Sequence, residues 1–309
     1  MAVLSLQNIA VRSIFENYAV LQIVIVRSVV AIPCTLLFFR YEGHWGVPRT
    51  TRFALHFWRG FLLFVAYTTY FMGLVAIPLA DASAIRYAAP IFVTFFSVII
   101  LGETVGLRRW LGVFIGFIGV LLIVRPGATT FNIGAIFVLI TALTYALSAI
   151  LTRRLKTTDS SATMSYYSTL VYLLAALILS PIVAYIGSTG QTHPSLIFLL
   201  RPWAMPTGTD WAIMLALGLI WTTGMYFVAQ AYSLTLASVA APFEYTALPI
   251  NVMWGFLLWH EIPTLTTWLG AILTIASSLY ILYRDVRQKA VALAPNDSIS
   301  EPEVGVGTE

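Results

Sequence analysis

The feature that most limits what this chain can fold into is a series of apolar stretches, each about as long as a lipid bilayer is thick. A helix needs about 20 mostly apolar residues to cross the hydrocarbon core of a membrane. Such stretches cover residues 18–39, 55–77, 80–101, 108–125, 132–152, 162–187, 210–234, 237–259 and 264–283, and a shorter one covers 1–13. They lack the alternation of polar and apolar residues that membrane strands show. We therefore predict an all-α polytopic membrane protein with about ten transmembrane helices, embedded in a lipid bilayer.

The composition excludes several other classes of protein. Hydrophobic residues make up 59% of the 309 and charged residues only 10%, whereas a soluble domain carries about 25% charged residues. The 17 Lys and Arg residues are scattered singly or in pairs, so we expect no nucleic-acid partner. The lone cysteine, Cys34, excludes a disulfide framework. With no phosphate-binding loop and no catalytic arrangement in the sequence, we expect no ATP hydrolysis, no enzyme activity, no cofactor and no metal site.

The distribution of basic residues between the loops predicts an orientation in the membrane. Loops on the cytoplasmic side carry an excess of Lys and Arg. The loops after even-numbered helices and the C-terminal segment hold Arg40, Arg49, Arg52, Arg108, Arg109, Arg153, Arg154, Lys156, Arg284, Arg287 and Lys289. The opposite side holds only Arg12, Arg125 and Arg201. This bias predicts a cytoplasmic C-terminus.

The sequence also contains an internal repeat with a shift of 158 positions. Under this shift Tyr87 aligns with Tyr245, Ala89 with Ala247, Glu103 with Glu261, Trp110 with Trp268, Leu111 with Leu269 and Gly112 with Gly270. We predict two repeats, 1–126 and 127–284, followed by a disordered cytoplasmic tail at 285–309. Five helices is an odd number, so the second repeat enters the membrane from the opposite side. Two inverted five-helix repeats are a transporter architecture, with the substrate site between them.

The first helix is shorter than its counterpart in the second repeat. A shift of about 141 aligns Arg12 with Arg153 and Met1 with Ala142, although the partner helix begins near Asn132. We expect that the start of the chain is truncated. The alternative is a first helix of half length.

Two stretches of the sequence resemble a known family. Ala80–Pro126, "ADASAIRYAAPIFVTFFSVIILGETVGLRRWLGVFIGFIGVLLIVRP", is similar to the EamA repeat of the drug/metabolite transporter superfamily, and Ala237–Leu282 looks like a second copy. The resemblance implies ten helices, a bacterial inner-membrane location and secondary transport of a small organic solute. It also implies a central cavity lined by helices 1–4 and 6–9, with helices 5 and 10 at the periphery. Riboflavin carriers and carriers of amino-acid-like metabolites look closest, but no motif chooses between them.

Charged residues inside membrane helices are the main candidates for function, because charge is costly in a bilayer. Arg59 lies near a helix end, and we expect it to extend to the membrane interface. Arg27 lies deeper, and lining the cavity or a structural role both remain open for it. Asn251 is a further polar candidate for binding substrate. Aromatic side chains suited to stacking on a planar solute are Tyr67, Tyr70, Trp221, Tyr226, Tyr245 and Trp254.

The most specific candidates for substrate binding or coupling are Arg86 and Glu244, which occupy the same repeat position beside Tyr87 and Tyr245. Our hypothesis is that both face the central cavity. Arg86 would attract an anionic group of the substrate, and Glu244 would bind a cationic group or a proton that couples transport. The alternative is a buried network that only locks the two halves together.

Three further features of the sequence allow more than one interpretation. Pro90, Pro242 and Pro249 can break the helices that carry this pair. Gly112 and Gly116 allow close helix approach, either inside the chain or in a homodimer. The alternatives to a carrier are an intramembrane enzyme acting on lipid, a channel and a non-transporting membrane scaffold.

Overall fold

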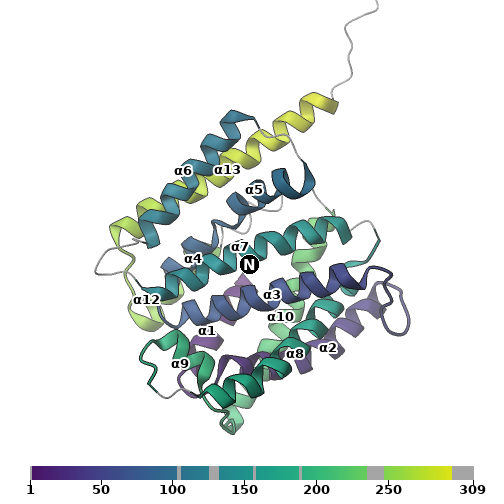
Figure 1. The fold of residues 1–309 in the computed structure, drawn as a ribbon, viewed down its shortest axis with the longest axis vertical. Coiled ribbons are helices and arrows are strands. Elements are labelled where there is room, and N and C mark those ends of the chain that lie inside the picture. The colour runs from purple at the N-terminus through teal and green to yellow at the C-terminus, as the bar shows by residue number, and fades with distance from the viewer. Residues whose placement is uncertain are drawn as a thin grey trace, which may run out of the picture.

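The computed structural model describes residues 2–102, 106–124, 132–155, 158–187, 190–234 and 247–293. All regular secondary structure in these ranges is helical, so the protein is an all-α polytopic membrane protein, as predicted (Figure 1). The helices are α1 (Ala2–Ile14), α2 (Val20–Tyr41), α3 (Phe53–Leu74), α4 (Leu79–Arg86), α5 (Ala89–Leu101), α6 (Leu107–Val124), α7 (Ile133–Leu155), α8 (Ser161–Ile186), α9 (Pro194–Leu200), α10 (Gly208–Leu234), α12 (Ala247–Trp259) and α13 (Leu265–Leu293).

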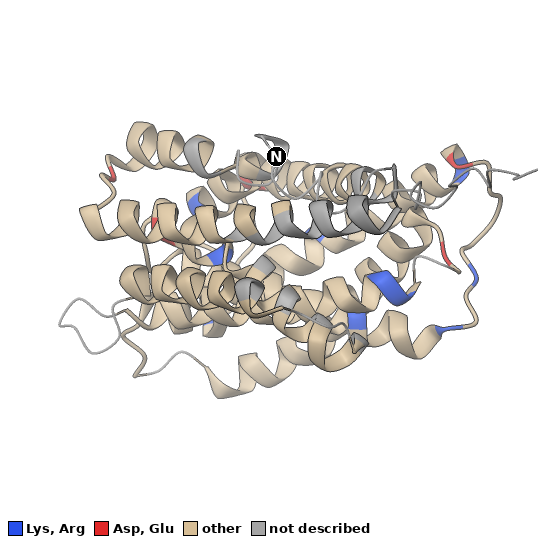
Figure 2. Ribbon diagram, turned by 90° about the horizontal axis from the view of Figure 1, so that it is seen from above, with Lys and Arg blue, Asp and Glu red and all other residues tan. Residues whose placement is uncertain are grey.

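The apolar sequence of the helices explains why they form a bundle suited to a bilayer. Five segments in the described ranges are long and apolar enough to cross a membrane: Val20–Tyr41, Leu79–Ile100, Ile133–Leu155, Ser161–Ile186 and Gly208–Val228. Acidic and basic residues occupy little of the ribbon in Figure 2. Because each helix satisfies its own backbone hydrogen bonds, it can lie in hydrocarbon without unpaired peptide groups.

The apolar stretch at 80–101 is not one continuous helix. α4 ends at Arg86 and α5 begins at Ala89, so Tyr87 lies in the break between them. Pro90 has no amide hydrogen to donate to the carbonyl of Arg86 four residues earlier, and proline is in general poorly accommodated inside a helix. The structure thus has the helix break that Pro90 made possible.

The internal repeat is visible in the helix bounds. α5 and α12 begin at Ala89 and Ala247, and α6 and α13 begin at Leu107 and Leu265, each pair 158 positions apart. Matching the halves in order relates α1 to α7, α2 to α8 and α3 to α10. The helix contacts exchange under this relation: α3 packs on α7 as α1 packs on α10, and α3 packs on α8 as α2 packs on α10. Such exchange is what a two-fold relation between the halves produces.

Equivalent helices α6 and α13 lie side by side at one edge of the bundle (Figure 1). The Thr274 hydroxyl donates to the Gly116 carbonyl at 3.4 Å, and a Cβ atom on Gly119 would lie 2.8 Å from the Gly270 carbonyl oxygen. Advancing along α6 therefore means going back along α13, so the two helices are antiparallel. These glycines serve a contact within the chain, and a homodimer remains a prediction without support from them.

The C-terminal helix is longer than the apolar segment predicted from the sequence. We placed the start of the disordered tail at residue 285, but α13 continues to Leu293. Residues 285–293 contain no Pro or Gly and include the good helix formers Arg, Gln, Lys, Ala and Leu, so the helix can extend beyond the apolar stretch. The remainder of the predicted tail lies outside the described residues.

Candidate functional site

Arg27 of α2 is almost fully enclosed by the bundle, with 1% of its surface exposed, less than any other Arg, Lys, Asp or Glu whose burial the structure describes. Three aromatic rings from three other helices surround its guanidinium group. The guanidinium carbon lies 4.3 Å from the ring centre of Trp221, 5.0 Å from that of Tyr172 and 5.6 Å from that of Phe71. Rings at such distances attract a cation through their negative faces.

The polar atoms around Arg27 have few partners. Nε, Nη1 and Nη2 of Arg27 form no hydrogen bond with any described residue. The hydroxyl of Tyr172 lies near both Arg27 and Thr68 without the geometry of a hydrogen bond to either. The Thr68 hydroxyl is likewise without a hydrogen bond among the described residues. Buried polar groups normally have partners, so this concentration of orphaned groups points to a functional site.

Arg86, at the end of α4, is also surrounded by aromatic rings. Its guanidinium carbon lies 5.4 Å from the ring centre of Tyr70, 5.8 Å from that of Tyr145 and 5.9 Å from that of Tyr67. The Tyr67 ring in turn packs edge-on against Trp221, with ring centres 4.3 Å apart. Because Trp221 contacts Arg27, the two arginines belong to one group. We define the central arginine–aromatic cluster as Arg27, Arg86, Tyr67, Tyr70, Phe71, Tyr145, Tyr172 and Trp221.

Helix periodicity explains how α3 supplies three rings to this cluster. Tyr67, Tyr70 and Phe71 are spaced three and four residues apart, which places them on one face of the helix. All three are buried, with Tyr70 and Phe71 almost fully enclosed. The sequence predicts Tyr67, Tyr70 and Trp221 as candidates, whereas Phe71, Tyr145 and Tyr172 are found only in the structure. The spacing on α3 could have found Phe71, whereas no local signal marks Tyr145 or Tyr172.

The remaining predicted site residues are placed differently. Asn251 of α12 is buried, receives a hydrogen bond from Asn8 of α1 at 3.4 Å, and donates one to Ser83 of α4 at 2.8 Å. Its amide group thus links three helices. Tyr87 is buried in the break between α4 and α5. Glu244 and Tyr245 lie outside the described residues.

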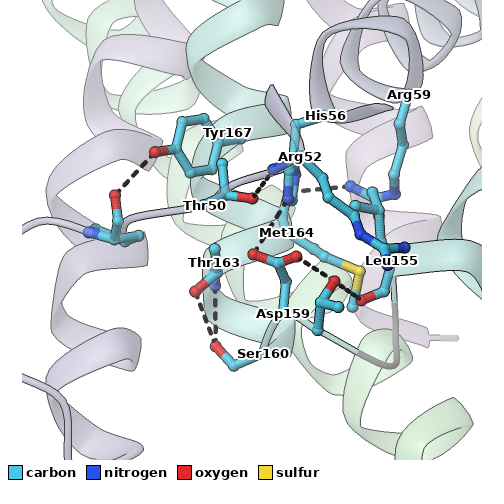
Figure 3. A network of polar contacts seen from close by, with 12 residues as sticks. Thr50, Arg52, His56, Arg59, Leu155, Asp159, Ser160, Thr163, Met164 and Tyr167 are labelled. Atoms are coloured by element: carbon cyan, nitrogen blue, oxygen red, sulfur yellow. Dashed lines mark hydrogen bonds and ion pairs between the residues drawn. The ribbon is translucent and has the colours of Figure 1, made fainter. Parts of the chain in front are cut away.

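The expectation for Arg59 was wrong. Its side chain turns inward, with 6% of the residue exposed, and does not extend to the interface. It donates to the Thr152 hydroxyl at 2.8 Å, to the Met164 carbonyl at 3.0 Å and to the Ser168 hydroxyl. Figure 3 shows Arg59 beside a wider polar network that includes His56 and Asp159. Acceptors on the neighbouring helices α7 and α8 remove the need for the guanidinium to reach water.

In the part of the chain that the structure describes, no three His, Cys, Asp or Glu side chains come together to hold a metal ion.

Comparison with known proteins assigns the chain to a family. The sequence matches the EamA-like transporter family over residues 1–125 and 132–283. The chain belongs to the EamA-like transporter family. Membership confirms the resemblance found in the sequence, and it makes this membrane protein a member of a transporter family and not of an enzyme family.

Individual relatives of this EamA-like protein are named for different solutes. It is 26% identical to an S-adenosylmethionine uptake transporter of Rickettsia prowazekii, over 84% of this chain and 80% of the relative. It is 29% identical to a riboflavin transporter of Vibrio cholerae, over 84% of this chain and 81% of the relative. It is 26% identical to the pseudopaline exporter CntI of Pseudomonas aeruginosa, over 89% of this chain and 90% of the relative.

The fold of the EamA-like protein also matches a solved crystal structure. The two superpose with a TM-score of 0.61 at 17% sequence identity, covering 93% of this chain and 96% of the other. At this identity the likeness concerns the fold alone.

Proposed function

We propose that this protein is a secondary transporter that moves a small organic solute across the bacterial inner membrane by alternating access between two five-helix halves. The central arginine–aromatic cluster is the observation that carries the proposal. Its residues come from α2, α3 and α4 of the first half and from α7, α8 and α10 of the second. A solute held there contacts both halves, so movement of one half against the other can expose it to either side of the membrane.

The predicted pair retains its roles in this proposal. Arg86 binds an anionic group of the solute beside Tyr87, and Glu244 binds a cationic group or a coupling proton beside Tyr245. The position of Arg86 among Tyr67, Tyr70 and Tyr145 supports the first role. The role of Glu244 rests on its repeat position and on the cost of a carboxylate inside a membrane.

Asn251 is the third predicted site residue, and it is hydrogen-bonded to two other helices. Its bonds to Asn8 and Ser83 make it a link between α1, α4 and α12, through which it would shape the site. The amide keeps a second N–H donor and a second oxygen lone pair, through which it would contact the solute directly, as the sequence suggested.

The names of the relatives make riboflavin and solutes related to amino acids the first candidates for transport. A channel and a non-transporting scaffold are the competing functions. A channel shows no saturable counterflow, and a scaffold tolerates loss of Arg86 and Glu244.

Expression in a bacterial host, with mass-spectrometric profiling of metabolites inside and outside the cells, tests the proposal. We expect the wild-type protein to move at least one solute and Glu244→Gln to abolish this movement while folding normally. Arg40→Gln is the matched control, because Arg40 lies at the end of α2 beside Trp45, away from the cluster. A folded Glu244→Gln variant with wild-type transport would refute the role of Glu244. Absence of any transported solute would count against the carrier.

A further inference from the structure

The position of Arg27 requires a physical explanation that the fold alone does not provide. A guanidinium group stays protonated in proteins, so burial cannot be accommodated by loss of the proton. Burial of a charge is unfavourable unless the group is paired and hydrogen-bonded. Arg27 has only 1% of its surface exposed. It lies about seven residues into a helix that is long and apolar enough to span a membrane.

The aromatic rings around Arg27 compensate for only part of this cost. Cation–π contacts with Trp221, Tyr172 and Phe71 stabilise the positive charge. A guanidinium group also carries five N–H donors, and the face of a ring is a weak acceptor for them. Three nitrogen atoms therefore remain without a hydrogen-bond acceptor from the described residues.

Three other arginines that the structure describes have the acceptors that Arg27 lacks. Arg59, also buried, has three acceptors, and Arg12 forms an ion pair with Glu261. Arg201 donates to the carbonyl of Phe15 at 2.9 Å. The fold can thus supply acceptors to arginines inside and at the ends of the bundle, and among the described residues it supplies none to Arg27.

No acidic side chain that the structure describes pairs with Arg27 in the central cluster. The acidic side chains that the structure describes lie in loops or in the first or last turns of helices: Glu16, Glu42, Asp81, Asp159, Asp210 and Glu261. None of these six forms an ion pair with Arg27. Arg86 joins the same cluster through Tyr67 and Trp221. A cation such as Arg27, without an acceptor in an apolar, aromatic setting, attracts a negative charge strongly, because the surroundings screen it little.

We propose that Arg27 is the main anion-binding residue of the transport site, with Arg86 in the same cluster, and that the solute is an organic acid whose carboxylate or phosphate group meets the Arg27 guanidinium. The inference rests on the proposed transport function and specifies its substrate class. The planar fork of the guanidinium suits the two oxygen atoms of either group. The hydroxyl of Tyr172 provides a further hydrogen-bonding group beside Arg27, the hydroxyl of Thr68 lies near that of Tyr172, and the rings pack against the rest of the solute.

Binding to the purified full-length protein in detergent tests this inference, with the fluorescence of tryptophan and the thermal midpoint as readouts. The probes are matched pairs of an acid and its neutral counterpart: benzoate with benzamide, phenyl phosphate with phenol, and flavin mononucleotide with riboflavin. We expect at least one acid to bind the wild type tenfold or more tightly than its counterpart. The carboxylate and phosphate pairs separate the two sources of negative charge.

The variants decide whether Arg27 is responsible for that preference. Arg27→Met, which keeps the size of the side chain and removes its charge, is expected to lose the preference for the acid. Arg27→Lys keeps the positive charge but lacks the planar guanidinium fork, and it is expected to retain part of the preference for the acid. Arg40→Gln removes another arginine that lies over a ring, 4.1 Å from the ring centre of Trp45, and should bind as the wild type does.

Several outcomes would overturn the inference. These are equal binding of acids and neutral counterparts, an acid preference that persists in Arg27→Met, and no acid-selective binding by any pair. A structural role for Arg27 would appear as a lower thermal midpoint of ligand-free Arg27→Met. If Glu244 were the missing partner, the double variant Arg27→Met/Glu244→Gln would restore that midpoint.

The metabolite profiling described above separates failure of this inference from failure of the proposed function. Transport of a neutral or purely cationic solute would refute the organic acid while leaving the carrier intact. Transport of no solute would refute the carrier, whereas acid-selective binding that depends on Arg27 would still establish the site.

Discussion

At the scale of single residues, Arg27 and Arg59 both lie within apolar helices, but their buried side chains have opposite environments. Arg59 is held by hydroxyl and carbonyl groups of α7 and α8, whereas Arg27 is surrounded by rings and lacks hydrogen-bond acceptors among the described residues. A bonded arginine connects helices and stabilises the bundle. An arginine that the fold leaves unbonded is a candidate for binding solute.

The bonded arginine leads to a prediction about stability. Ser168→Ala removes one acceptor of the buried Arg59 guanidinium and should lower the free energy of unfolding by about 1–3 kcal/mol, because a charged donor loses a bond. Thermal unfolding in detergent measures the loss. Ser165→Ala, on the same helix and not among the hydrogen-bond acceptors of Arg59, is the control and should leave the midpoint nearly unchanged. Equal midpoints for both variants would show that the bond contributes little.

At the scale of secondary-structure elements, the break between α4 and α5 positions the predicted binding residues. Arg86 is the last residue of α4 and Tyr87 lies in the break. If the helix were continuous here, the side chains of Arg86 and Tyr87 would point in other directions. The contacts of Arg86 with the rings of α3 would then change. Residues in the second repeat that correspond to the break lie outside the described residues.

Removal of the proline tests the role of the break. Pro90→Ala restores an amide hydrogen that can bond to the Arg86 carbonyl, so α4 and α5 can join. We expect a fall of tenfold or more in transport rate, with the protein still folded, because Arg86 and Tyr87 move. Pro181→Ala, at an exposed position within α8, is the control. Wild-type transport by Pro90→Ala would mean that the break is not needed for function.

At the scale of the whole molecule, the exchange of helix contacts relates the two halves. Contacts of α3 with α7 and α8 have counterparts in those of α10 with α1 and α2, and the equivalent helices α6 and α13 are antiparallel. This arrangement supports the predicted inversion. In an inverted pair either half can take the conformation of the other, which is the physical basis of alternating access.

The orientation of the whole molecule is open to a direct test. The excess of Lys and Arg in loops after even-numbered helices predicts a cytoplasmic C-terminus. A green fluorescent protein fused after Glu309 should therefore fluoresce in bacterial cells, and alkaline phosphatase fused there should be inactive. Fusions after Arg201, in a loop predicted on the opposite side, should behave in the reverse way. The opposite result at Glu309 would overturn the topology.

Much of the fold could be predicted from the sequence because membrane helices are local structures. Each satisfies its backbone hydrogen bonds within one apolar segment, so length and apolarity suffice to find it. The same local reasoning identified the proline that breaks the fourth segment, and the 158-position repeat agrees with the bounds of α5, α12, α6 and α13. It placed the end of α13 too early, because polar residues can continue a helix outside the membrane.

The environment of each buried charge was decided only by the tertiary structure. Arg59 and its acceptors Thr152 and Ser168 are 93 and 109 positions apart in sequence, and no local pattern indicates that they meet. The rings around Arg27 likewise come from three other helices. The sequence by itself thus determined where helices form and which of them carry charge. Helix packing decided which charge is satisfied by the fold and which is left to bind a solute, because hydrogen bonds in hydrocarbon depend on groups brought together across the bundle.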